Sequence, residues 1–134
     1  MSDNGDYIAK LKHKNGNFYY MYNTNTSYNS SLTGNWKNVV SASNIREIYV
    51  GLQCLSISEQ SFAASSVRIV DMTNAYYIST IPAKLCLNCP NLHTFIGSKD
   101  SENEVIMNAE IFRGSTIYSI TTIKFPYRTK DLKK

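Results

Sequence analysis

The residues that could do chemistry are few, and the cysteines come first. Cys86 and Cys89 have the spacing that is typical of redox motifs and of metal ligands. A structural zinc site usually needs four ligands, but the chain adds only Cys54 and the distant His13 and His93. A redox dithiol would also need a strand–helix–strand pattern around it, which is missing here. We therefore interpret Cys86 and Cys89 as small core residues.

A short acidic stretch is the second candidate. Asp100, Glu102 and Glu104 could do acid–base chemistry if one carboxylate were buried, and their oxygens could bind calcium. They lie among Ser98, Lys99 and another serine, however, and this composition indicates a solvated loop. Their spacing fits no calcium loop. The chain also has no glycine-rich phosphate loop and no nucleophile elbow. We expect no catalytic residue, no cofactor and no metal, and therefore a protein that is not an enzyme.

Length and charge limit the remaining functions. The chain has 134 residues, 43% of them hydrophobic, which allows one domain with arms. Its net charge of +4 is uneven: about +2 over residues 1–40, −1 over 41–124 and +3 over 125–134. A nucleic-acid binder would more often carry a basic stripe across its folded face. We expect protein partners and no nucleic acid.

The first residues and the cysteine count bear on location. The start has no basic segment followed by an apolar one, and no apolar stretch is long enough for a membrane helix. We therefore expect no signal peptide and no contact with a membrane. Apart from Cys86 and Cys89 the chain has no paired cysteines, which fits a reduced compartment, or a virion assembled in one.

Four segments of the chain resemble one another. Their first apolar residues are Ile45, Val67, Leu92 and Ile117, so the spacings are 22, 25 and 25 residues. Each segment contains a short apolar stretch typical of a strand, and a regular period of this size indicates stacked repeats. Stacked repeats serve as scaffolds or binding surfaces more often than as enzymes.

The stretches between these strands carry a second pattern. An apolar pair five residues apart is followed by small residues, as in Ile57 with Phe62, Ile81 with Cys86, and Met107 with Phe112. The chain from 44 to 126 thereby resembles leucine-rich repeats of the BspA type, with Cys86 in place of the family's Phe. The resemblance implies a mainly β fold with short helical segments, a small solenoid. The alternative is an ordinary small β-rich domain with similarly spaced strands.

The segment before the repeats predicts a β-hairpin over residues 7–22. Asn15-Gly16 is a strong signal for a two-residue turn, which would pair Leu11 with Tyr20 and Ala9 with Tyr22. Apolar and polar residues alternate, so one face would be buried. That face would carry Ala9, Leu11, His13, Phe18, Tyr20 and Tyr22.

The hairpin also resembles the N-terminal strand–turn–strand of some tailed-phage fibre and head-appendage proteins, which attaches them to the particle. Residues 1–22 are thus expected to form an attachment arm, and 23–43 a polar linker and cap that includes Trp36. Residues 44–126 would form the repeat solenoid and 127–134 a basic tail.

These expectations give a non-enzymatic structural or binding protein, most simply a small bacteriophage virion component (capsid, head-appendage or tail-associated). Its partners would be other virion subunits or further copies of itself. The alternatives are a BspA-like surface adhesin, or a small cytoplasmic adaptor or inhibitor. The residues expected to contact a partner are Lys10, Lys12, Phe18, Tyr20, Tyr22, Tyr49, Arg68, His93 and Tyr118.

Overall fold

The structure is a computed structural model that describes residues 4–97, 106–115 and 119–121. The described residues form short strands and one 3₁₀ helix. The elements are β1 (Ala9–His13), β2 (Phe18–Met21), β3 (Ser31–Leu32), η1 (Gly34–Asn38), β4 (Ile45–Val50), β5 (Ser56–Ile57), β6 (Ile69–Asp71), β7 (Thr80–Ile81), β8 (Thr94–Ile96), β9 (Ile106–Met107) and β10 (Ser119–Thr121).

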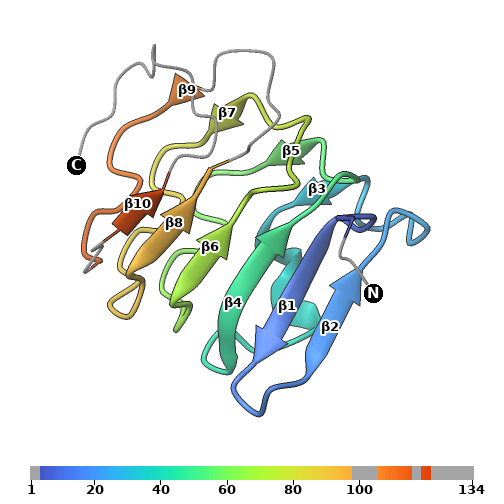
Figure 1. The fold of residues 1–134 in the computed structure, drawn as a ribbon, viewed down its shortest axis with the longest axis horizontal. Helices are drawn as coiled ribbons and strands as arrows, with labels where there is room; N and C mark the ends of the chain where they lie inside the picture. Colours follow the sequence, from blue (N-terminus) through green and yellow to red (C-terminus); the bar gives the residue numbers. More distant parts are fainter. Residues whose placement is uncertain (1–3, 98–105, 116–118, 122–134) are drawn as a thin grey trace.

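A six-stranded sheet is the main element, with strand order β10-β8-β6-β4-β1-β2 (Figure 1). Strands β4, β6, β8 and β10 are parallel neighbours. Strand β1 pairs antiparallel with both β4 and β2. The expected hairpin is therefore present, and its first strand lies inside the sheet, between β2 and β4.

The parallel strands pair at the spacing that the sequence predicts. Ile48 lies opposite Val70, Val70 opposite Phe95, and Phe95 opposite Ile120, which gives steps of 22, 25 and 25 residues. Ile48, Val70 and Phe95 are fully buried, because alternate residues of a strand point to the same face. The apolar period thus fixes both the register and the buried face.

A second row of short strands lies beside this sheet (Figure 1). Strand β3 pairs in parallel with β5, and β7 with β9, as two separate two-stranded sheets. Three similar segments follow β5, β7 and β9. We call residues 58–65, 82–89 and 108–115 the turn segments. Backbone hydrogen bonds join them in order, for example from Phe62 N to Leu85 O at 3.1 Å.

The turn segments repeat one backbone conformation. Each has two left-handed residues four positions apart: Gln60 and Ala64, then Lys84 and Asn88, then Glu110 and Gly114, with φ between 55 and 78°. Left-handed residues interrupt an α-helix, since its residues all have negative φ. The described chain is mainly β, as predicted. The short helical segments implied for these stretches are absent there, and η1 is the helix that the described residues contain.

The segment expected as a polar linker and cap contributes to the core. Its strand β3 buries Leu32, and η1 buries Trp36. The indole Nε1 of Trp36 donates to the backbone carbonyl of Ser61 at 2.8 Å. Trp36 is therefore a packing residue, and the chain around Leu32 is a paired strand within the expected linker.

One continuous hydrophobic core joins the hairpin to the repeats. Leu11 of β1, Trp36 of η1 and Ile48 of β4 belong to it, together with Val70 and Phe95. The inner face of the six-stranded sheet therefore packs against the second row of strands and the turn segments. On the outer face, Phe18 and Tyr20 of β2 are exposed, and Lys10 and Tyr49 are half-buried.

Candidate functional site

The hairpin turn differs from the sequence prediction by one residue. Ala9 pairs with Met21 and Leu11 with Tyr19, where the two-residue turn predicted Tyr22 and Tyr20. The loop has three residues, because His13 N donates to Asn17 O and Gly16 N to His13 O. Gly16 has φ +93° and takes the left-handed position that closes such a loop.

This shift moves three aromatic residues to the opposite face. The expectation that Phe18, Tyr20 and Tyr22 share the buried face of Ala9 and Leu11 is wrong, because a one-residue slip inverts every side chain of a strand. Tyr19 and Met21 face the core instead. Phe18, Tyr20 and Tyr22 are 44, 44 and 43% exposed, on the side that carries Lys10 and Lys12.

Strand pairing extends this side across the sheet in two rows. One row runs from Tyr20 through Lys10 and Tyr49 to Asp71 and Ile96. The other runs from Phe18 through Lys12 and Glu47 to Ile69 and Thr94. Six residues at the hairpin end form what we call the aromatic–lysine face: Lys10, Lys12, Phe18, Tyr20, Tyr22 and Tyr49.

Ring and cation contacts order the aromatic–lysine face. The Lys10 ammonium lies 4.6 Å from the ring centroid of Tyr49 and 5.1 Å from that of Phe18. The Tyr20 ring stacks on Tyr22 at 5.9 Å and meets Tyr7 edge-on at 5.8 Å. Cation–π and ring–ring contacts of this kind contribute about 0.5–1.5 kcal/mol each at accessible sites. These contacts favour the observed arrangement of the rings and of Lys10.

A carboxylate completes the aromatic–lysine face at its inner end. Glu47 accepts a hydrogen bond from the Tyr49 hydroxyl and lies 3.8 Å from the Lys12 ammonium. Glu47 and the buried Tyr7 are additional residues at this site that no sequence motif marks. Glu47 could have been found from its position two residues before Tyr49, which places both side chains on one face of a strand.

Two other predicted contact residues lie elsewhere. Arg68 is exposed and His93 half-buried, just before β6 and β8. They are adjacent, since His93 N donates to Arg68 O at 3.0 Å. Strand β4 separates β6 from the hairpin, so these residues do not join the aromatic–lysine face. Tyr118 lies outside the described residues, as do Asp100, Glu102, Glu104 and the basic tail.

Cys86 and Cys89 are core residues, as interpreted, and Cys54 is buried as well. All three are buried as free thiols, and Cys89 Sγ donates to the carbonyl of Phe62 at 3.0 Å. Burial raises the pKa of the Cys54 thiol to about 12, and it raises the pKa of Cys86 well above its ordinary value. Both thiols are protonated at neutral pH, and a protonated thiol is a poor nucleophile and metal ligand.

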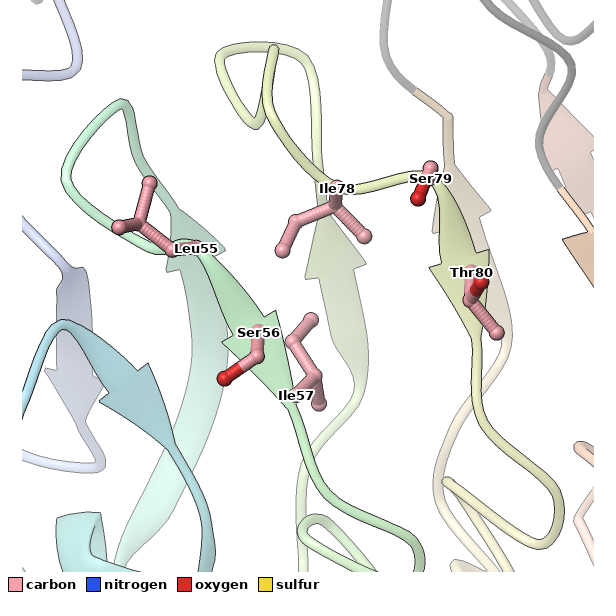
Figure 2. A pocket seen from close by; sticks show the side chains of 6 residues that line it. All are labelled: Leu55, Ser56, Ile57, Ile78, Ser79 and Thr80. Atoms are coloured by element: carbon pink, nitrogen blue, oxygen red, sulfur yellow. The ribbon is translucent and has the colours of Figure 1, made fainter.

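A small pocket opens on the other side of the molecule, between β5 and β7, which do not pair with each other (Figure 2). It measures about 190 Å³. Aliphatic and hydroxyl side chains line it: Leu55, Ser56, Ile57, Ile78, Ser79 and Thr80. None of these carries an ionisable group, so the lining supplies no acid or base for catalysis.

Among the side chains that the structure describes, no three His, Cys, Asp or Glu residues group closely enough to hold a metal ion. Over the described ranges, no helix has both the length and the apolar character required to cross a bilayer.

The chain was also compared with known proteins. A scan against protein-family models and searches of curated proteins and of solved structures return no match to this chain.

Proposed function

We propose that this chain is a non-enzymatic protein-binding module that docks on its partner through the aromatic–lysine face. One observation carries the proposal: three aromatic side chains, each more than two-fifths exposed, lie together beside two lysines on a sheet. Large apolar side chains are usually buried, so a cluster of them on an accessible surface indicates a binding site.

The composition of the face is suited to protein contacts. Tyrosine offers apolar area and a polar tip with few rotatable bonds, and such residues are enriched at interfaces. The face lies on β1, β2 and β4, whose inner side chains are in the core. A strand support anchored in the core lowers the entropy that binding costs, because its backbone does not have to become ordered on binding.

We further propose that the repeats form a small leucine-rich-repeat-like solenoid of the BspA type, in which each unit stacks on the next. Its support is the parallel pairing of β4, β6, β8 and β10, with the recurring left-handed pairs of the turn segments. The absence of α-helix in the described turn segments favours a variant built of strands and turns.

The setting that we propose is a virus particle, where the partner would be another subunit of a bacteriophage virion. The hairpin is the element that carries the resemblance to phage attachment strands, and it also carries most of the aromatic–lysine face. A surface adhesin or an intracellular adaptor would use the same face on a different partner.

The test compares two sets of exposed aromatic residues. The combined variant Phe18→Ser, Tyr20→Ser and Tyr22→Ser removes the rings of the aromatic–lysine face. The matched control is Tyr77→Ser, because Tyr77 is 65% exposed and lies between β6 and β7, away from the hairpin. Each chain is immobilised and exposed to an extract of its native source, and the stoichiometry of the bound protein is measured.

The expected result is a stoichiometric partner that the wild type and Tyr77→Ser retain and the triple variant loses. Thermal unfolding of all three chains shows that each is folded. Equal retention by the triple variant would refute the proposed docking face. Light scattering at two protein concentrations detects self-association, in which the partner is another copy of the chain.

A further inference from the structure

The outer edge of the six-stranded sheet is β2, which pairs with β1 alone. The direction of its backbone groups follows from the hydrogen bonds of β1. Lys14 N, directly after β1, donates to Asn44 O at 2.7 Å on the β4 side, so the even-numbered residues of β1 face β4. His13 N donates to Asn17 O at 2.9 Å, so the odd-numbered residues face β2.

This alternation decides which residues of β2 face outward. In an antiparallel pair, hydrogen-bonded and non-hydrogen-bonded positions alternate. Tyr19 and Met21, opposite Leu11 and Ala9, face β1. Phe18 and Tyr20 therefore point their backbone N–H and C=O groups away from the sheet. Within the described residues, no hydrogen bond satisfies these groups.

An open edge of this kind is a template for another strand. Natural sheets usually protect their edges with proline, charge, a bulge or a covering loop. Here the outward groups belong to two residues whose exposed rings also lie on the aromatic–lysine face. An added strand would gain backbone hydrogen bonds along β2 and side-chain contacts with Phe18 and Tyr20.

The charges indicate what such a strand would carry. The hairpin, residues 7–22, has Lys10, Lys12 and Lys14 and no acidic residue. The ammonium groups of Lys10 and Lys12 lie 5.1 and 5.7 Å from the Phe18 ring centroid, while Lys10 lies 4.6 Å from the Tyr49 centroid and Lys12 lies 3.8 Å from Glu47, so both cations lie on the face between β2 and β4. A long acidic side chain of a strand added at about 4.8 Å from β2 would extend over Phe18 toward these cations.

We propose that the β2 edge binds an extended acidic segment of the partner protein, which adds as a further strand of the sheet. This inference rests on the proposed function, since it names the form and the charge of the partner at the aromatic–lysine face. Acidic residues at alternate positions of the segment lie on the side of Lys10 and Lys12. The other positions extend the side of Tyr19 and Met21.

Two competing occupants fit the edge less well. A second copy pairing β2 with β2 would bring two hairpins together that each carry three lysines and no acid. A single-stranded nucleic acid could stack on the rings and contact the lysines, but its phosphates offer no donor for the outward carbonyls of Phe18 and Tyr20.

Two substitutions of Tyr20 separate the contribution of the β2 backbone edge to binding from that of the aromatic–lysine face. Tyr20→Pro and Tyr20→Thr both remove the ring, but only proline also removes the outward N–H. Proline is tolerated on an edge strand when its missing N–H would face solvent, so the hairpin remains paired. The probe is a short blocked peptide of alternating Val and Glu, and the control peptide has Lys in place of Glu.

Binding is measured on the full chain by the chemical shifts and hydrogen exchange of the backbone amides. The Glu peptide is expected to bind the wild type and to protect the amides of Phe18 and Tyr20 from exchange. It should bind Tyr20→Thr more weakly, and Tyr20→Pro at least about tenfold more weakly than Tyr20→Thr. The Lys peptide should not bind.

Four outcomes would overturn the inference: no binding of the Glu peptide to wild type, equal binding to both variants, self-pairing blocked by Tyr20→Pro, or displacement of the peptide by single-stranded DNA. Failure here is distinguishable from failure of the proposed function. If the triple serine variant lost the native partner while Tyr20→Pro and Tyr20→Thr retained it equally, the docking face would be supported and strand addition at the β2 edge would be refuted.

Discussion

The edge strand β2 and the first turn segment each lie at one end of a row of hydrogen-bonded elements. They differ in whether their outermost backbone groups have a hydrogen-bond partner. In the turn segments, Ile111 O accepts from Cys86 N, and Leu85 O accepts from Phe62 N. The corresponding carbonyl of the first turn segment belongs to Ser61, and it accepts from the indole of Trp36. The outward groups of Phe18 and Tyr20 on β2 have no such donor or acceptor among the described residues.

This difference separates an edge that stabilises the molecule from an edge that can recruit a partner. Trp36 supplies one N–H where a preceding segment would have supplied its backbone, and it fills the core at the same time. A buried carbonyl without a partner is costly, whereas a solvent-exposed edge is satisfied by water until a strand replaces that water. Substitutions at the two places should therefore affect different measurements.

The largest effect is expected at Trp36. Trp36→Ala should lower the free energy of unfolding by about 3–5 kcal/mol, since it removes a fully buried ring and its hydrogen bond. Trp36→Phe retains most of the volume and leaves the Ser61 carbonyl unpaired, so about 1–3 kcal/mol is expected. Urea denaturation measures both values. Equal stability of Trp36→Phe and wild type would mean that the Trp36 hydrogen bond to Ser61 does not stabilise the molecule. The two edges would then not differ as described.

A slightly smaller effect is expected at Leu11, in the middle of the hairpin strand. Leu11 is fully buried and lies opposite Ile48 of β4. Leu11→Ala should cost about 2–5 kcal/mol, close to the cost of the matched Ile48→Ala, and both chains should unfold in one transition. A separate early transition confined to Leu11→Ala would mean that the hairpin is an independently docked arm.

The smallest effect is expected in the hairpin turn. Gly16 has φ +93°, so Gly16→Ala should cost about 1 kcal/mol. Asn15→Gly should also be destabilising, because Asn15 does not have a positive φ and its Oδ1 accepts from Asn17 N at 2.9 Å. Thermal unfolding of the two variants gives the comparison. A two-residue turn would require positive φ at both positions, where glycine is favoured, so a stabilisation by Asn15→Gly would contradict the observed register.

Much of the fold could be predicted from the sequence, because its signals are local or periodic. The spacing of Ile45, Val67 and Leu92 predicts parallel strands that pair in steps of 22 and 25 residues, and the structure has these steps. Asn15-Gly16 predicts the position of a hairpin. Burial of Cys86 and Cys89 follows from their place in the same period.

The candidate site was less predictable. The residues of the aromatic–lysine face were named from the sequence, but Phe18, Tyr20 and Tyr22 were assigned to the buried side. The side of a strand depends on whether the loop has two or three residues, and the dipeptide Asn15-Gly16 is compatible with both. Leu32 was missed because one apolar residue in a polar stretch gives no periodic signal.

The sequence by itself determined the composition of this protein and its periodicity: which residues are apolar, how far apart they recur, and where the chain must turn. The tertiary structure alone decided which side of the hairpin is exposed and that β1 lies between β2 and β4. It also decided which edge is closed by Trp36 and which is open. The physical reason is that period and turn signals act between near neighbours. Strand register and edge satisfaction, by contrast, depend on hydrogen bonds between residues far apart in the chain.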